Sequence, residues 1–66
     1  MVTVNNEPIE YSQGMLLSDA LVKAGVDTGA AMLITVDGVF TEKSKAGRIS
    51  IPDNAEIRTM PLLSGG

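Results

Sequence analysis

Cysteine and histidine are both absent from the 66 residues of this chain. Without cysteine the chain can form neither a disulfide nor a thiolate metal site, and it has no thiol nucleophile. Without histidine it lacks the commonest general base and metal ligand. Its carboxylates are scattered singly, with neither paired nor metal-ligand spacing. These absences argue against an enzyme, and we expect no bound metal or cofactor.

Further absences narrow the class of partner. Tyr11 and Phe40 are the only aromatic residues, so the chain offers no stacking platform for single-stranded nucleic acid. The net charge of −3 argues against a phosphate backbone as partner. No apolar run approaches the roughly 20 residues that span a bilayer, and the start of the sequence lacks the basic region of a secretory signal. We therefore expect a cytoplasmic protein that binds neither nucleic acid nor membrane.

The first eleven residues predict a β-hairpin. Val2–Val4 alternates apolar and polar residues, as a half-buried strand does. A tight turn fits Asn5–Glu7, because Asn tolerates a positive φ angle. A second alternating strand is expected over residues 8–11, with Pro8 at its start or on an edge because proline cannot donate a ladder hydrogen bond.

One amphipathic helix is expected over residues 16–24. Its apolar residues recur at helical spacing: Leu17, Ala20, Leu21 and Ala24. Gly25 is a natural residue to end this helix, whereas its start is open, because Met15 stands where a capping Ser or Thr is expected. The spacing places Leu21 in the core, facing Val4, Ile34 and Ile57.

The second half of the chain predicts another hairpin and a last strand. Residues 32–36 form an apolar run, and Asp37-Gly38 suits a two-residue turn into a return strand at 39–40. The polar stretch 41–47 is expected to be a solvated loop, although its basic residues leave a binding patch as the alternative. Residues 48–51 are extended or a short strand, and 56–60 form the last strand.

The resulting order is hairpin, helix, hairpin and final strand. A long crossover separates the first strand from the last, so the two can pair in parallel. The expected fold class is α+β: a ubiquitin-like β-grasp with a mixed sheet of four to five strands and one main helix across it. We assign residues 1–61 to this domain and 62–66 to a flexible C-terminal tail.

The tail ends in Ser64, Gly65 and Gly66. Glycine has no Cβ, so such an end can enter a slot too narrow for other residues. The reactive group that it offers is the α-carboxylate of Gly66, which is inert until another enzyme activates it. The alternative is a frayed terminus or a leftover linker.

A β-grasp of this length that ends in Gly-Gly resembles the prokaryotic ubiquitin-like sulfur carriers, the ThiS/MoaD family. The resemblance covers essentially the whole chain and rests on three stretches: Val2–Glu7, the hairpin Ile34–Val39 and the end Met60–Gly66. The turn Asp53–Ala55 matches the Asp-Gly-Asp of thiamine carriers only in part. Thr41–Ser44 replaces the Pro-Arg pair of many thiamine carriers, and the Trp that follows it there is missing, which puts the pathway in doubt.

The resemblance implies a chemistry for the tail. An E1-like enzyme adenylates the carboxylate of Gly66 with ATP and Mg²⁺, and Ser64 and Gly65 thread into its nucleotide site. Sulfur from a cysteine desulfurase or a rhodanese-type donor then replaces AMP, giving a thiocarboxylate. Thiazole synthase or the large subunit of molybdopterin synthase receives the sulfur. Candidate docking residues for these partners are Met60, Pro61, Leu62 and Leu63. For Leu62 and Leu63 the equal alternative is that they complete the core.

Several alternatives stay open. Thiamine biosynthesis is the pathway that we favour, while Pro61 after the apolar Met60 leans toward a molybdopterin-type carrier. A ubiquitin-like modifier that is joined to lysines through Gly66 requires the same first step. A β-grasp binding domain with an incidental Gly-Gly end is a further alternative, and loss of Gly66 would leave its function intact.

Overall fold

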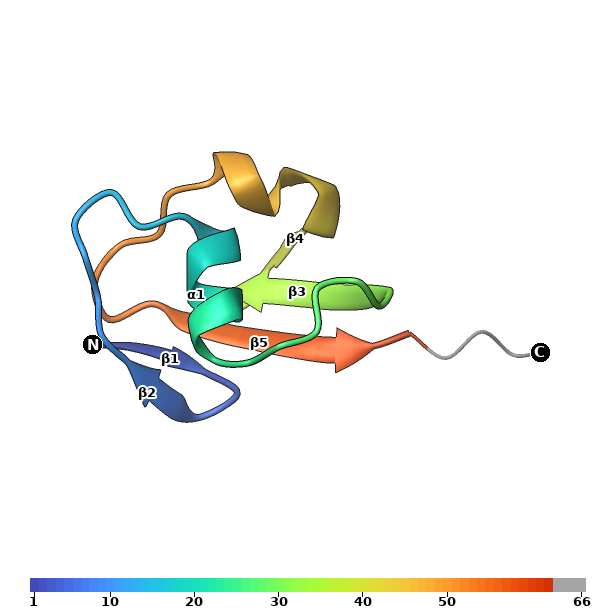
Figure 1. Cartoon of the computed structure of the whole chain (residues 1–66), viewed down its shortest axis with the longest axis horizontal. Coiled ribbons are helices and arrows are strands. Elements are labelled where there is room, and N and C mark those ends of the chain that lie inside the picture. The colour runs from blue at the N-terminus through green and yellow to red at the C-terminus, as the bar shows by residue number, and fades with distance from the viewer. Residues whose placement is uncertain (63–66) are drawn as a thin grey trace.

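Residues 1–62, which a computed structural model describes, form a mixed sheet covered on one face by a helix (Figure 1). The strands are β1 (Val2–Val4), β2 (Glu7–Ile9), β3 (Met32–Val36), β4 (Val39–Thr41) and β5 (Glu56–Pro61). Their order in the sheet is β2-β1-β5-β3-β4. β1 and β5 run parallel, and the other neighbours are antiparallel. The expected parallel pairing of first and last strand is confirmed.

Both hairpins turn through residues with positive φ angles. Asn5 and Asn6 have φ angles of 52° and 69°, and Asp37 and Gly38 have 52° and 83°. These are the conformations that a two-residue turn between twisted strands requires, so both predicted turns are confirmed. The second strand was placed too late, at residues 8–11. Because β1 has only three residues, β2 finds its last partner at Ile9.

The helix α1 spans Leu17–Lys23, within the predicted range of 16–24. Its N-cap residue is Leu16, whose side chain has no hydrogen-bond acceptor. The cap comes instead from Asp19, whose carboxylate accepts the N–H of Leu16 at 3.1 Å. This is the reciprocal half of a capping box, and it explains how the helix starts without Ser or Thr.

The helix ends in a Schellman motif around Gly25. Gly25 has a φ angle of 77°. Its N–H donates to the carbonyl of Val22, and the N–H of Val26 donates to the carbonyl of Leu21, both at 3.0 Å. These two bonds satisfy carbonyls that the end of a helix would otherwise leave unpaired. The predicted stop at Gly25 is confirmed.

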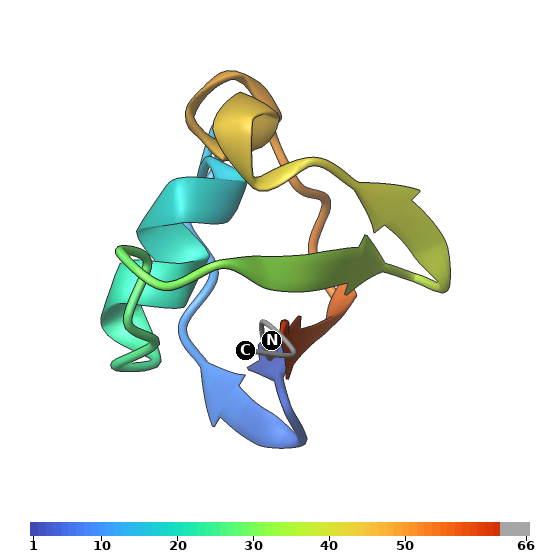
Figure 2. The same cartoon turned by 90° about the vertical axis from the view of Figure 1, so that its right-hand side faces the viewer.

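The core lies between α1 and the sheet, and Figure 2 shows the helix beside the curved strands. Leu21 is fully buried in one cluster with Val4, Ile34 and Ile57, as its place in the helical pattern predicted. The other fully buried large side chains are Val2 and Leu17. Because both layers are short, the same few aliphatic residues supply the hydrophobic stabilisation of the fold.

The stretch expected to be a solvated loop contains a helix. Residues Lys43–Arg48 form the 3-10 helix η1, which packs beside α1. Ala46 is its buried residue, and it joins the same core cluster. The chain then continues in extended form and bridges Leu16 with Ser50. One small apolar residue among charged ones has no helical periodicity, so the sequence pattern did not reveal η1.

Candidate functional site

β5 leads into the predicted tail, and its side chains alternate between the core and the outer face of the sheet. Ile57 is buried, whereas Arg58 and Met60 are exposed. The strand pairing places Leu33 of β3 opposite Met60. Directly opposed residues share a face of the sheet, so Leu33 lies on the outer face with Met60.

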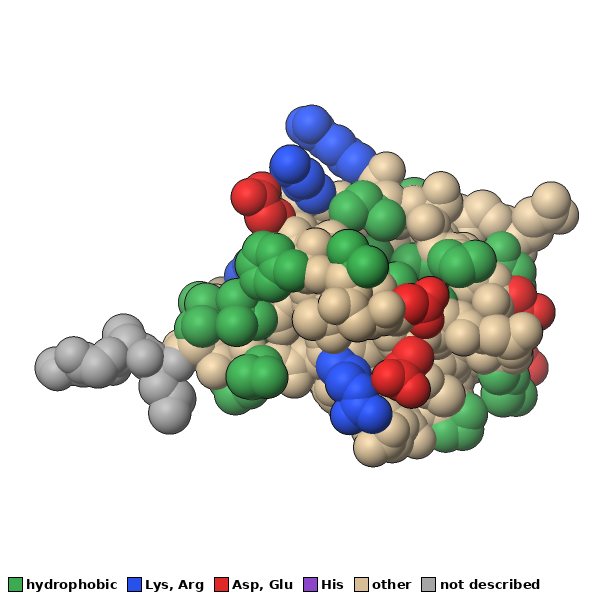
Figure 3. All heavy atoms as spheres, turned by 180° about the vertical axis from the view of Figure 1, so that it is seen from behind, with side chains coloured by type: hydrophobic (Ala, Val, Ile, Leu, Met, Phe, Trp, Pro, Cys, Tyr) green, Lys and Arg blue, Asp and Glu red, His purple; other side chains and the backbone are tan. Residues whose placement is uncertain are grey.

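Apolar side chains gather on this outer face next to the tail. We define the outer-face patch as Leu33, Phe40, Met60 and Leu62. Phe40 is 57% exposed, Met60 63% and Leu62 51%, and Leu33 is half-buried. Figure 3 shows hydrophobic side chains clustered toward one end of this face. Large apolar side chains exposed side by side mark an interaction surface more often than isolated ones do.

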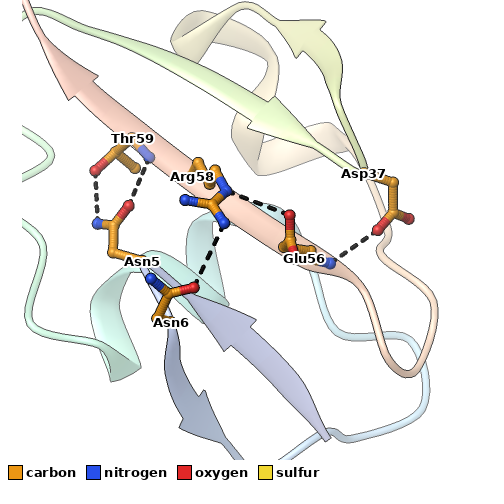
Figure 4. Close-up of polar contacts among 6 residues, drawn as sticks. All are labelled: Asn5, Asn6, Asp37, Glu56, Arg58 and Thr59. Atoms are coloured by element: carbon orange, nitrogen blue, oxygen red, sulfur yellow. Dashed lines mark hydrogen bonds and ion pairs between the residues drawn. The ribbon is translucent and has the colours of Figure 1, made fainter.

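Around the first half of β5 the outer face is polar. Nε of Arg58 donates to Glu56 Oε1 at 3.2 Å, and a terminal nitrogen of Arg58 reaches Asn6 Oδ1 at 3.5 Å (Figure 4). Both charged side chains are 55% exposed, so their ion pair adds little to stability. The ion pair matters instead for where apolar side chains lie along β5. Its charged groups occupy the first half of the strand, so the outer-face patch lies at the end of β5.

Asn5 extends the pairing of β5 beyond the end of β1. Its Oδ1 accepts the N–H of Thr59 at 2.9 Å, and its Nδ2 donates to Thr59 Oγ1 at 2.9 Å (Figure 4). The side chain thus replaces the strand residue that β1 no longer supplies. Pro61 is the next residue of β5 whose backbone nitrogen points to this side. Since proline has no N–H, no donor is left unpaired there.

On its other side, β5 stays paired up to the first residue of the predicted tail. Pro61 lies opposite Met32. The N–H of Leu62 then donates to the carbonyl of Ala31 at 3.1 Å. Leu62 is the last residue that the structure describes. The sheet therefore sets both the position and the direction in which the chain leaves the domain.

The predicted site residues divide into two groups. Met60, Pro61 and Leu62 lie together at the end of β5, as expected from their adjacency. Leu63, Ser64, Gly65 and Gly66 lie outside the described residues. The sequence reading missed Leu33 and Phe40 as members of the patch. Leu33 lies opposite Met60, and Phe40 lies on β4 opposite Thr35, so their place on this face becomes visible only once the register of β3 and β4 is known.

Two surface hollows differ in their relation to the patch. One of about 410 Å³ lies between α1 and the loop at residues 12–15, away from the tail. The other, of about 280 Å³, is lined by Phe40, Thr41, Glu42, Lys45 and Ile49. Phe40 belongs both to the lining of the second hollow and to the outer-face patch, whereas Lys45 lies outside the patch.

Two kinds of feature are missing from residues 1–62. No group of three or more Cys, His, Asp or Glu side chains in this range is arranged to hold a metal ion. Within the same residues, no helix has the length and apolar content to cross a membrane.

An electrostatic contact lies at the opposite end of the molecule from the end of β5 (Figure 1). The Met1 ammonium donates to Asp53 Oδ1 at 3.0 Å, and the N–H of Asn54 donates to the same oxygen at 2.9 Å. The hydrogen bond from the ammonium is the main reason that the pKa of Asp53 lies below its ordinary value. The contact closes the turn before β5 and plays no part at the patch.

Comparison with known proteins bears on the fold. The sequence matches no protein-family model and no curated protein. The structure is similar to the crystal structure of the thiamine biosynthesis protein ThiS from Geobacter metallireducens, with a TM-score of 0.73. The alignment covers 98% of this chain and 97% of that one, at 16% sequence identity. This chain has the ubiquitin-like β-grasp fold. At that level of identity, the likeness to ThiS concerns the fold alone.

The β-grasp fold accounts for the placement of the candidate site. Its last strand lies in the middle of the sheet, between β1 and β3. A chain that continues from this strand leaves the domain from the centre of the sheet. The outer-face patch therefore lies where β5 ends, and Leu62, the last described residue, belongs to it.

Proposed function

We propose that this β-grasp protein is a sulfur carrier that reacts through the carboxylate of Gly66. The observation that carries the proposal is an exposed apolar patch at the end of β5 on a ThiS-like fold, in a chain whose sequence continues from there to Ser64-Gly65-Gly66. The carrier is a substrate for other enzymes and supplies no catalytic group. We place this chemistry in the cytoplasm, with thiamine thiazole as the favoured product.

The first step is activation of the carboxylate. A carboxylate oxygen of Gly66 attacks the α-phosphorus of ATP, bound with Mg²⁺ by an E1-like enzyme, and pyrophosphate leaves. The outer sulfur of a persulfide on a cysteine desulfurase or a rhodanese-type donor then attacks the acyl carbon and AMP leaves, giving an acyl disulfide. A second thiol attacks this disulfide at the donor's sulfur, which releases the thiocarboxylate and leaves a disulfide between the donor and the thiol. Gly65 and Gly66 suit the approach to a nucleotide because no side chain widens the backbone there.

The outer-face patch supplies the docking energy in this proposal. Exposed Met60, Phe40 and Leu62 present apolar area that a partner can bury. Methionine has a flexible side chain that fits more than one partner. A carrier needs such adaptability, since it visits the E1-like enzyme, the sulfur donor and the enzyme that accepts the sulfur. Leu63 is a further candidate contact.

The test is ATP–pyrophosphate exchange with the E1-like enzyme of the same genome. We expect the wild-type chain to support exchange. Deleting Gly66 moves the carboxylate one residue short, extending the chain by one residue moves it too far, and Gly65→Val restricts and widens the backbone. We expect all three changes to abolish exchange and to leave the folded domain unchanged by circular dichroism.

Gly47→Ala provides a matched control. A Cβ at Gly47 meets only the Ser18 hydroxyl, at 4.0 Å, and lies in the folded domain. We expect this variant to support exchange as the wild type does. Exchange that survives deletion of Gly66 would show that the tail is not the functional element. The chain would then be a β-grasp binding domain.

Intact mass of the protein from its native host separates the two fates of an activated Gly66. A sulfur carrier shows the wild-type mass with one oxygen replaced by sulfur. A ubiquitin-like modifier appears instead as a ladder of conjugates. The same spectrum shows whether Gly66 is the last residue. For the pathway, Pro61 after Met60 supports a molybdopterin-type carrier as the second candidate, and transfer of sulfur to either acceptor enzyme decides between them.

A further inference from the structure

We infer that Lys43 is a positioning residue for the tail, an inference that rests on the proposed carrier function. Lys43 lies on η1, far in sequence from both β5 and the loop before β3. Its Nζ donates to the carbonyl of Ala30 at 2.8 Å. The carbonyl of the next residue, Ala31, accepts the N–H of Leu62 at 3.1 Å. Two adjacent carbonyls thus connect η1 to the first residue of the tail.

The loop between these contacts depends on local bonds and on Lys43. Asp27 Oδ1 accepts the N–H of Gly29 at 2.9 Å, and the N–H of Ala30 makes a longer bond of 3.4 Å to the carbonyl of Asp27. Gly29, Ala30 and Ala31 are exposed and bury no side chain. Since packing does not hold this segment, the charged hydrogen bond from Lys43 has a large share in fixing it.

Lys43 differs from the other lysine of η1. Lys43 is half-buried and reaches across to the loop. Lys45 is 64% exposed, and its Nζ lies 3.7 Å from Glu42 Oε2, three residues before it in the sequence. Both lysines carry one positive charge. Replacing either one therefore has the same effect on a partner that responds only to the charge of η1. Only Lys43 is linked to the tail.

The link matters because Leu62, the last described residue, is still bonded to the sheet through Ala31. When Ala31 is held, Leu62 stays paired with the sheet and the carboxylate starts its path from a set point. When the loop moves, the chain can detach back toward Met60, and more residues must be ordered each time the tail enters a nucleotide site. Ordering each extra residue costs conformational entropy. A loose exit therefore weakens productive binding without altering the chemistry of the carboxylate.

The test compares Lys43→Met with Lys45→Met, which keep the aliphatic stem and remove one charge each. Because a lost hydrogen bond to a charged group opens the local structure, we expect the Leu62 amide of Lys43→Met to exchange with water about three- to tenfold faster. NMR-detected exchange measures this without any enzyme. We expect Lys45→Met to leave the exchange rate unchanged, and Lys43→Arg, which retains a donor, to restore it in part.

A kinetic measurement then tests the consequence for the tail. In ATP–pyrophosphate exchange we expect Lys43→Met to raise KM for the carrier with unchanged kcat, and Lys45→Met to change neither. Unchanged Leu62 exchange in Lys43→Met would refute the link, and so would an unchanged KM. If the wild-type chain is no substrate for the E1-like enzyme, the carrier function fails instead. Faster Leu62 exchange in Lys43→Met alone would still support Lys43 as the residue that fixes the exit of the chain.

Discussion

Truncation of Leu21 is the sharpest test of the core. Leu21 is fully buried between α1 and the sheet, so Leu21→Ala removes apolar atoms from water-free surroundings and leaves a cavity. Such changes cost about 2–5 kcal/mol. A domain of 66 residues has a free energy of unfolding of roughly 3–10 kcal/mol. The single change thus removes from a fifth of the stability to all of it.

Urea unfolding followed by circular dichroism measures this loss, because the chain has no tryptophan for fluorescence. With an m-value of about 1 kcal/mol/M, a loss of about 3 kcal/mol lowers the midpoint by about 3 M. Leu21→Met keeps the volume and should cost less than about 1.5 kcal/mol, which keeps the position measurable if Leu21→Ala unfolds outright.

Val22→Ala is the matched control for this experiment. Val22 is the next residue of α1 and is 67% exposed. Its truncation should change the free energy of unfolding by less than about 0.5 kcal/mol. If Leu21→Ala and Val22→Ala shift the midpoint equally, or if Leu21→Ala shifts it by less than about 0.5 M, then the assigned inner face of the helix is wrong.

Two further predictions concern the patch and β5. Met60→Asp should weaken binding to the E1-like enzyme at least about tenfold without changing the urea midpoint, because a charge in an apolar contact is costly to desolvate. Titration calorimetry measures the affinity, and Val22→Asp on the opposite face is the control. Wild-type affinity in Met60→Asp would place the docking surface elsewhere. Asn5→Gly keeps the positive φ angle but loses both bonds to Thr59, so it should lower the free energy of unfolding by about 1–2 kcal/mol. Asn5→Ala should lose about 1 kcal/mol more through strain, and wild-type stability in Asn5→Gly would show that the bonds contribute nothing.

The parts of the fold that could be predicted depend on local chemistry. Asp37-Gly38 and Asn5-Asn6 carry their turns in their own backbone preferences. The helix follows from the spacing of Leu17, Ala20 and Leu21. The parallel pairing of β1 with β5 then follows, because a first and last strand joined by a long connection have few other arrangements.

What could not be predicted depends on contacts between distant residues. The helix η1 is fixed by burial of Ala46 against α1, which no local pattern reveals. The bonds of Asn5 to Thr59 and of Lys43 to Ala30 join residues whose proximity exists only in the folded chain. The same limit applies to the patch: Met60 was named from its neighbours in sequence, whereas Phe40 required the register of the sheet.

The pairing of Thr3 with Glu56 has a consequence for how the domain folds. The two central strands of the sheet come from opposite ends of the sequence, so the sheet cannot close until a loop of more than fifty residues has been drawn together. Folding rates fall as contacting residues lie further apart along the chain. We therefore expect the β3–β4 hairpin and α1 to form early and the docking of β1 on β5 to come last. On a ribosome, β1 has to wait, without its parallel partner, until β5 has left the exit tunnel.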